Sequence, residues 1–298
     1  MIALVTAVRD EAERVDDFLD HHRSIGVERA YVYLDRCRDG TAERLAAHPE
    51  VTTIAWDRDP AHEWFAQHQN VVVADALRRA AADGADWLLH LDVDEYAWGG
   101  PVGGLDPAVG HLGPALSATA AEVVRFPTVE AIPEALGAHP PHRAFEHVQP
   151  DGRFARELLD PRTGDLVPIA GPLGHLRGKT AVRVAAGLVP DDPHAWRRVD
   201  GSVPSEVLLG AHLHVVVAGA AQWQAKYRKL AGPEHWPNGC PVPFPKQAWN
   251  AVAGDLSPEE AQAYYDRWVV VAEDDLQRGL AEGTIVHWPL LRTTLGRS

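Results

Sequence analysis

Three scarcities in the 298-residue sequence each exclude a class of protein: few cysteines, no long apolar run and a deficit of positive charge. Its two cysteines, Cys37 and Cys240, form no metal-binding or disulfide pattern, so we expect a reducing compartment. No apolar stretch approaches the ~20 residues of a membrane-spanning helix. A formal net charge of −14 argues against non-specific binding to nucleic acid or to an anionic membrane surface.

The first apolar segment, IALVTAV, has seven residues and begins directly after Met1. No basic segment precedes it, and Arg9, Asp10 and Glu11 follow where a cleavage site of small residues would stand. The segment is therefore predicted to be a first strand and not a signal peptide. We expect a cytoplasmic protein.

Strand and helix patterns alternate over the first hundred residues. Apolar runs predict strands, and amphipathic segments ended by glycine predict the helices between them. The predicted strands cover residues 2–8, 29–34, 51–56 and 86–92, and the predicted helices cover residues 10–25, 42–47 and 64–83. This alternation predicts an α/β fold with a mostly parallel central sheet flanked by helices.

Residues 99–298 have a less regular pattern, with loop-like segments rich in Pro and Gly between short strand-like runs. Ser257-Pro258-Glu259-Glu260 is a capping box with proline at the first helical position, and it predicts a helix that runs to about Leu280. No repeat and no long linker divides the chain. We expect one domain over residues 1–298, with a nucleotide-binding half at 1–98 and an acceptor-side half at 99–298 that ends in helices.

Aspartates stand at the ends of the predicted strands, where parallel sheets bind ligands. Asp10, Asp35, Asp57 and Asp92 each fall at or just after such an end. The carboxyl edge of the sheet is therefore the predicted site.

The stretch LLHLDVDEY places three carboxylates at the end of a buried strand with no Lys or Arg among them. The nearest basic residues in sequence are Arg79 and Arg125, so either the carboxylates face water or a cation that is not part of the chain compensates them. Side chains two apart in an extended chain point the same way, which would bring Asp92 and Asp94 together. Two such carboxylates suit Mg²⁺ or Mn²⁺.

Two segments, VTAVRDEAERVDDFLDHHRSIGVERAYVYLDRCRDGTAERL and QNVVVADALRRAAADGADWLLHLDVDEYAW, resemble nucleotide-sugar glycosyltransferases of the family-2-like and family-92-like groups. The resemblance covers residues 2–98 and continues more loosely through GKTAVRV and LHVVVAGAAQWQAKYRKL. It implies the GT-A fold: one Rossmann-like sheet with a metal-binding Asp-x-Asp, an irregular acceptor-side region and C-terminal helices.

The resemblance also implies a metal site. Asp92 and Asp94 match the carboxylates that bind the cation and the diphosphate, and Glu95 matches a residue that orients their loop. His214 matches a late histidine of the metal shell. His212 lies two residues earlier on the same face of a predicted strand and remains the alternative.

A donor site follows from the same resemblance, with Asp35 at the nucleoside and Lys179 at the phosphates. Asp35 is otherwise a turn residue, and Gln69 is otherwise a solvated helix position. Asp10 replaces the usual asparagine of the family pattern, which leaves its own role open. The residues implied for the nucleotide-sugar site are Thr6, Val8, Glu11, Asp35, Gln69, Asp92 and Lys179.

The implied reaction transfers a sugar from a nucleoside-diphosphate sugar, with UDP favoured, to a hydroxyl-bearing acceptor that the sequence does not identify. Inversion is also implied only by the resemblance. The base that deprotonates the acceptor would be Asp191 or Asp192, beside His194, or Glu130. Each of these carboxylates is otherwise a loop or surface residue.

Two other functions use a similar sheet. A sugar-phosphate nucleotidyltransferase would need a glycine-rich loop after the first strand, and TAVRDEAERV contains no glycine. A non-catalytic nucleotide-binding relative would be expected to lose the Asp-x-Asp, which this chain keeps.

Overall fold

The computed structural model describes nine ranges of the chain. They are residues 1–56, 65–102, 110–133, 147–149, 155–159, 166–170, 177–215, 219–230 and 252–287. The predicted strand-end Asp57 and the predicted helix start at Trp64 lie outside them. Internal contacts group the chain into two compact units, Met1–Thr128 with Arg177–His214 and Val129–Leu176 with Val215–Ser298. The predicted division into residues 1–98 and 99–298 of one domain stays a prediction.

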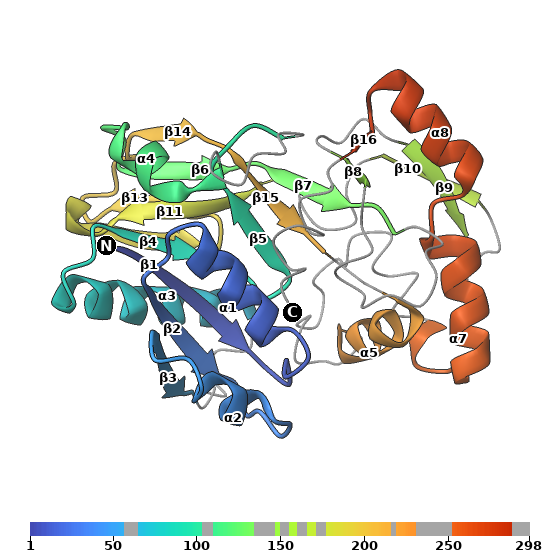
Figure 1. Ribbon diagram of the computed structural model, residues 1–298, viewed down its shortest axis with the longest axis horizontal. Coiled ribbons are helices and arrows are strands. Elements are labelled where there is room, and N and C mark those ends of the chain that lie inside the picture. The colour runs from blue at the N-terminus through green and yellow to red at the C-terminus, as the bar shows by residue number, and fades with distance from the viewer. Residues whose placement is uncertain are drawn as a thin grey trace. The chain divides into compact units, whose positions relative to one another are not determined.

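The first unit contains a seven-stranded sheet in the order β14-β6-β11-β4-β1-β2-β3 (Figure 1). β1 pairs in parallel with both β2 and β4, and β2 with β3, whereas β11 runs antiparallel to β4 and β6. The strands are β1 (Ile2–Val8), β2 (Arg29–Leu34), β3 (Val51–Ala55), β4 (Trp87–His90), β6 (Val123–Phe126), β11 (Lys179–Arg183) and β14 (Glu206–Leu208). The predicted α/β class with a mostly parallel, Rossmann-like sheet is confirmed.

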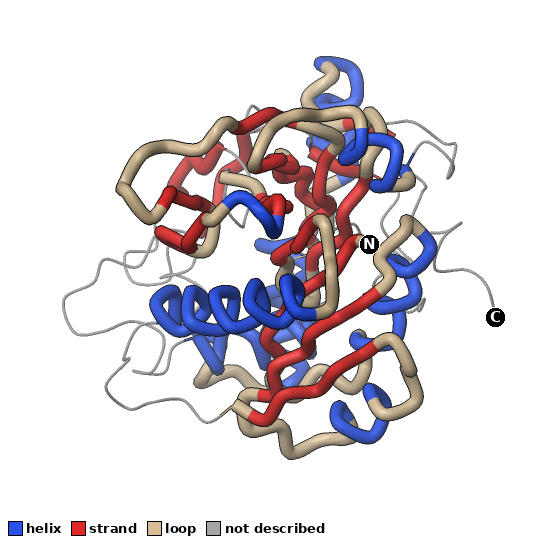
Figure 2. Tube along the Cα trace, turned by 90° about the vertical axis from the view of Figure 1, so that its left-hand side faces the viewer, coloured by secondary structure: helices blue, strands red, loops and turns tan. Residues whose placement is uncertain are grey.

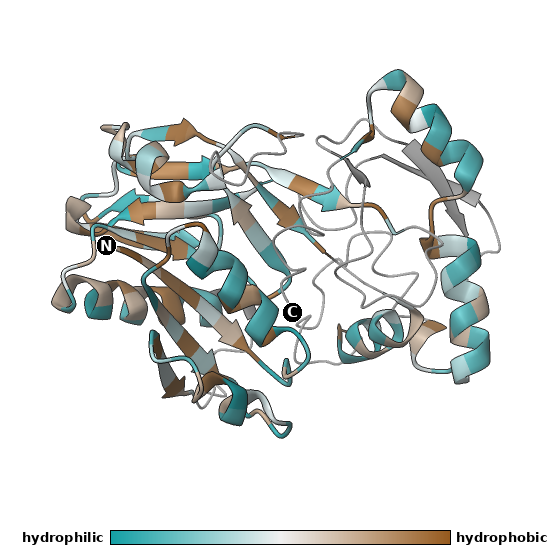
Figure 3. Ribbon diagram, viewed as in Figure 1, coloured by the Kyte–Doolittle hydropathy of each residue, from teal (hydrophilic) through white to brown (hydrophobic). Residues whose placement is uncertain are grey.

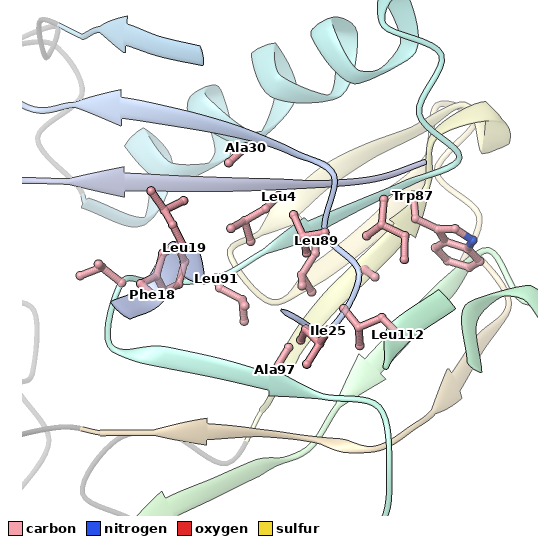
Figure 4. Packing of buried hydrophobic residues seen from close by; sticks show 14 of the residues in the cluster. Leu4, Phe18, Leu19, Ile25, Ala30, Trp87, Leu89, Leu91, Ala97 and Leu112 are labelled. Atoms are coloured by element: carbon pink, nitrogen blue, oxygen red, sulfur yellow. The ribbon is translucent and has the colours of Figure 1, made fainter. Parts of the chain in front are cut away.

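Helices cover both faces of this sheet (Figures 1 and 2). Alternation along β1 places Leu4 in the same cluster as Phe18 of α1, and it places Val5 in the cluster of Val72 and Ala76 of α3. Figure 4 shows the first cluster at close range. The helices of this unit are α1 (Val15–Ser24), α2 (Thr41–Leu45), α3 (Phe65–Ala82) and α4 (Leu112–Ser117).

Hydropathy follows the same arrangement, with brown, hydrophobic residues along β1 and β2 and teal, hydrophilic residues on α1 (Figure 3). Burial of the apolar face, at roughly 25 cal/mol per Å², holds each helix against the sheet. α1 begins at Val15, five residues after its predicted start at Asp10, because residues 12–14 form a turn.

Two antiparallel pairs complete the first unit. β5 (Glu95–Trp98) pairs with β15 (Ala211–His214), so that Glu95 lies opposite His214 in the register. β12 (Leu188–Asp192) and β13 (Ala195–Arg198) form a hairpin, preceded by the short 3₁₀ helix Val184–Ala186.

The second unit contains short strands and three described helices. β8 (His147–Gln149) pairs antiparallel with β7 (Thr128–Ala131) and with β16 (Val286–His287), and β9 (Ala155–Leu159) pairs with β10 (Leu166–Ala170). The helices are α5 (Ala220–Leu230), α7 (Pro258–Tyr264) and α8 (Glu273–Glu282). Within the described ranges, no helix combines the length and apolar character needed to cross a membrane. The cytoplasmic location stays a prediction.

The capping box before α7 is confirmed, because Ser257 Oγ accepts from Glu260 N and the Glu260 carboxylate accepts from Ser257 N. The single helix predicted to run to Leu280 is wrong. A π-helical turn over Tyr265–Val269 follows α7, and the chain becomes extended at Val270 (ψ 136°) before α8 begins. No glycine or proline marks that break.

Candidate functional site

The acidic stretch forms a turn between two strands. β4 ends at His90 and β5 begins at Glu95, and Glu95 N donates to Asp92 O at 3.0 Å. The expectation of an extended chain over Asp92 and Asp94 is therefore wrong, because the chain bends between them. The Glu95 carboxylate accepts from Asp92 N at 2.8 Å, as expected of a residue that orients the loop.

Lys179 supplies the positive charge that the neighbouring sequence lacks. Its Nζ lies 2.8 Å from Asp92 Oδ2 and 3.2 Å from Glu95 Oε2, and its side chain is 1% exposed. Burial alone would lower the pKa of Lys179, but Asp92 and Glu95 raise it above its ordinary value. The sequence reasoning did not consider this third source of positive charge, a lysine of the chain itself on a distant strand. Its single ammonium group cancels one of the two carboxylate charges, and a metal contact of Asp92 stays a prediction.

Asp92 also accepts a hydrogen bond from α3. Gln69 Nε2 donates to Asp92 Oδ1 at 2.9 Å, and Gln69 is buried. The Asp92 side chain keeps 34% exposure, so it remains open to a ligand on one side. Three residues that the sequence assigned to the donor site, Gln69, Asp92 and Lys179, therefore lie together.

The two histidines of β15 reach different carboxylates. His212 is fully buried, and its Nδ1 donates to Phe126 O at 3.0 Å while its Nε2 lies 3.4 Å from Glu95 Oε1. His214 Nε2 lies 3.8 Å from Asp94 Oδ2, with side-chain exposures of 9% and 14%. The sequence could not separate the two histidines, and the structure pairs His214 with Asp94.

Asp94 and His214 provide an oxygen and a nitrogen donor suited to Mn²⁺ or Mg²⁺. Neighbouring donors around a six-coordinate ion with bonds of about 2.1 Å lie about 3 Å apart, so a small rotation of either side chain would bring this pair into range. Among the described residues, no group of three or more His, Cys, Asp or Glu is arranged to hold a metal ion. The pair thus fits part of a metal site that a ligand and water would complete.

The loops after β1 and β2 are tied to each other at the same edge of the sheet. Asp35 N donates to Val8 O at 2.9 Å, and the Asp35 carboxylate, 8% exposed, lies 3.4 Å from Arg36 Nε. Glu11 N donates to Thr41 Oγ1 at 2.9 Å. Val8, Glu11 and Asp35 therefore belong to one connected edge.

Two residues at this edge adopt the left-handed backbone conformation without being glycine. Asp10 has φ 57° and Arg36 has φ 54°, and each stands two residues beyond the end of its strand. Asp10 Oδ1 accepts from Arg38 N at 2.7 Å, which joins the two loops. Such conformations cost of order 1–3 kcal/mol and cluster at functional sites. Thr6, by contrast, is fully buried inside β1.

The carboxylates named as possible bases hold other partners. Asp191 lies 3.2 Å from Arg197 Nε, and Asp192 lies 2.7 Å from Arg177 and accepts from His194 N at 2.7 Å. Glu130 is buried in the second unit, on β7 opposite Gln149. The role of a base stays a prediction for all three.

Two buried histidines of α1 hold the backbone of β5, and the sequence reasoning missed both. His21 Nε2 donates to Ala97 O at 2.8 Å, and Ala97 N donates to His22 Nε2 at 3.2 Å. Burial lowers the pKa of His21 to about 4 and lowers that of His22 well below its ordinary value. The spacing of His22 from Phe18, one helical turn on the apolar face, was the available signal.

The class that the fold and site define is a mostly parallel α/β protein with an acidic turn at the carboxyl end of a central strand. No protein-family model matches the chain, and no curated protein matches it.

Solved structures similar to the chain include glucosyl-3-phosphoglycerate synthase from Mycobacterium tuberculosis in complex with Mn²⁺, uridine diphosphate and phosphoglyceric acid (16% identity over 82% of this chain and 80% of that chain, TM-score 0.37). HddC from Yersinia pseudotuberculosis is similar at 11% identity, over 72% of this chain and 93% of that one, with a TM-score of 0.37. At TM-scores under 0.5 these similarities carry no argument about family or activity. Membership of the family-2-like or family-92-like group stays a prediction.

Proposed function

We propose that the protein is a cation-dependent glycosyltransferase that moves a sugar from a nucleoside-diphosphate sugar to a hydroxyl-bearing acceptor. The observation that carries the proposal is the pairing of Asp94 with His214 beside a fixed Asp92. Asp92 and Asp94 follow the carboxyl end of β4, where parallel sheets place their ligands, and His214 ends β15 beside Asp94. The preference for UDP, and inversion at the sugar, come from the sequence resemblance.

Asp94 and His214 would hold the Mn²⁺ or Mg²⁺ ion. When bound there, the ion supplies positive charge that stabilises the departing diphosphate. Both side chains are largely buried, at 9% and 14% exposure, so the protein restricts where that charge can sit. Phosphate oxygens and water would provide the remaining ligands.

The donor nucleoside would lie at the edge formed by Val8, Glu11 and Asp35. An ionised Asp35 carboxylate accepts hydrogen bonds only, and ribose hydroxyls or a uracil N3–H can donate them. Asp92 keeps lone pairs beyond those used by Gln69 and Lys179, and these can accept from a sugar hydroxyl.

A base must remove the proton of the acceptor hydroxyl. Asp191 is 57% exposed and Asp192 is 33% exposed, so an acceptor reaches Asp191 more easily. Glu130 remains the third candidate. The substitutions Asp191→Asn, Asp192→Asn and Glu130→Gln separate them, because only loss of the base removes a pH-dependent step from kcat.

The direct test is a thermal-shift screen of the purified chain against UDP, GDP and TDP, each with Mn²⁺, with Mg²⁺ and with a chelator. A ligand that binds only the native state raises the melting temperature. At a ligand concentration of 100 times Kd, it adds about 2.7 kcal/mol to the free energy of unfolding. We expect stabilisation by UDP with Mn²⁺ and its loss under chelation. No stabilisation by any nucleoside diphosphate with either cation would refute the proposal. A nucleoside triphosphate that stabilises more strongly would favour nucleotidyl transfer.

A further inference from the structure

Lys179 differs from a phosphate-binding lysine in what surrounds its ammonium group. We infer that Lys179 is a positioning residue that shares its one positive charge between Asp92 and Glu95 and so reserves Asp94 and His214 for the cation. This inference rests on the proposed function and deepens it, because it assigns the three carboxylates of the acidic turn to two separate roles.

The sheet explains how Lys179 arrives there. β11 runs antiparallel to β4 with Thr180 opposite His90, so Lys179 lies beside the residue that follows the last residue of β4. Lys179 is 87 residues away from Asp92 in sequence, yet the pairing of two neighbouring strands fixes its position at the start of the acidic turn.

The ammonium group already has two partners. Nζ lies 2.8 Å from Asp92 Oδ2 and 3.2 Å from Glu95 Oε2, and the side chain is 1% exposed. The ammonium group has a third N–H, but because the side chain is 1% exposed, a diphosphate could reach it only if the surrounding side chains moved. Movement of Asp92 or Glu95 away from Lys179 would leave that carboxylate without compensation. The expected phosphate contact of Lys179 is therefore replaced in this proposal by contacts within the turn.

Lys179 and Glu95 act together on Asp92. Glu95 Oε2 is close to both Lys179 Nζ and Asp92 N, at 3.2 Å and 2.8 Å, so the side chain and the backbone of Asp92 are held by the same buried pair. Gln69 fixes the other oxygen of Asp92. Asp94 has a different environment, with His214 at 3.8 Å, beyond hydrogen-bond distance.

This division of roles predicts how the affinity for Mn²⁺ alone depends on the charge of Lys179. With Lys179 present, one of the three carboxylate charges of the turn is cancelled, so a cation alone is attracted less strongly than it would be by all three. Removal of that charge by Lys179→Met should tighten the binding of Mn²⁺ alone about tenfold, because a unit charge acts strongly over short distances in a medium of low dielectric constant. For a phosphate-binding lysine, the same substitution would instead weaken the binding of UDP and leave the affinity for Mn²⁺ alone unchanged.

The experiment titrates Mn²⁺ into the full chain, with and without UDP, and measures free Mn²⁺ by electron paramagnetic resonance. Lys179→Met should bind Mn²⁺ alone about tenfold more tightly and lose at least about 100-fold in kcat, with a smaller change in the KM of the sugar donor. Lys229→Met, at an exposed lysine of α5, should match the wild type in every measurement.

A double variant, Lys179→Met with Glu95→Gln, keeps the test valid if the single variant does not fold. It removes one charge of each sign, so the affinity for Mn²⁺ alone should return to within about threefold of the wild type, while kcat stays low because Asp92 is no longer held.

Three results would overturn the inference, and they can be told apart. Weaker UDP binding with unchanged affinity for Mn²⁺ alone would make Lys179 a phosphate ligand and leave the proposed function standing. Unchanged Mn²⁺ binding and unchanged kcat would make the lysine merely structural. A wild-type chain that takes up no Mn²⁺ in the presence of UDP would refute the proposed function itself.

Discussion

His214 Nε2 lies 3.8 Å from Asp94 Oδ2, a separation too long for a hydrogen bond and short enough for a cation to bring the two atoms together. His212, two residues earlier on β15, is instead buried between Glu95 and the carbonyl of Phe126. One short strand therefore carries a histidine that faces the predicted ion and another that supports the turn. This difference leads to the first two predictions.

Asp94→Asn should weaken the binding of Mn²⁺ in the presence of UDP and reduce sugar transfer by at least about 100-fold, because an amide keeps the shape of the carboxylate but loses its charge. The thermal melting curve should remain that of a folded protein. Mn²⁺ titration and a transfer assay measure the two effects. Asp20→Asn, at a 51% exposed aspartate of α1, is the matched control. Full activity of Asp94→Asn under chelation would contradict the metal assignment.

Alanine at each histidine of β15 should give different results. His214→Ala should reduce Mn²⁺ affinity with UDP bound and lower the free energy of unfolding less than His212→Ala does. His212→Ala should lower the free energy of unfolding by about 2–4 kcal/mol, since it removes a fully buried ring and its hydrogen bond. Urea unfolding and Mn²⁺ titration of both variants provide the comparison. If His212→Ala lost the cation at unchanged stability, the assignment would be reversed.

Stability should fall as the pH decreases from about 6.5 toward 4. Burial lowers the pKa of His21 and of His90 to about 4, and that of His22 well below its ordinary value of 6.5; the charge of Lys179 adds to the effect at His90. The unfolded chain therefore takes up protons in this range that the folded chain does not. Each such histidine contributes a slope of about 1.4 kcal/mol per pH unit, with its stabilisation complete above the unfolded pKa.

Urea unfolding at pH 7, 6 and 5 measures this slope. His21→Gln should reduce the dependence of the unfolding free energy on pH by the contribution of one histidine. This reduction is expected even if the substitution also changes the stability at pH 7. His48→Gln, at a histidine whose side chain is 12% exposed and lies beside Asp16, serves as the comparison. Equal slopes for the wild type and His21→Gln would contradict the prediction.

Gly210 precedes β15 and limits where that strand can begin. It has φ +53°, and an added Cβ would meet the carbonyl oxygen of Trp98 at 1.9 Å. Gly210→Ala should therefore cost more than the 1–2 kcal/mol that left-handed backbone alone costs a side chain, and we expect about 3 kcal/mol. Gly187→Ala is the matched control, with φ +65° and open space around the new Cβ. Chemical unfolding of both variants measures the cost of the steric clash as the difference between their losses in unfolding free energy. Equal losses in the two variants would contradict the prediction.

Much of the first unit could be predicted from the sequence because its signals are local. Apolar runs and amphipathic segments indicated β1 to β4 and the helices between them. Asp35, Asp92 and Asp94 could be singled out because a strand end is visible in the sequence as the point where an apolar run stops, and their roles stay predictions. The histidines of α1 were missed because a buried histidine resembles a solvated one until its partner, the backbone of Ala97, is known.

The sequence by itself determined the parallel α/β class and the acidic centre at the end of β4, since both follow from the order of residues along a short segment. Only the tertiary structure decided that Lys179 pairs with both Asp92 and Glu95 and that His214, not His212, lies nearest Asp94. The physical reason is strand pairing. The antiparallel registers of β11 with β4 and of β15 with β5 bring these charges together across more than 80 residues of chain, and no local pattern encodes a register between distant strands.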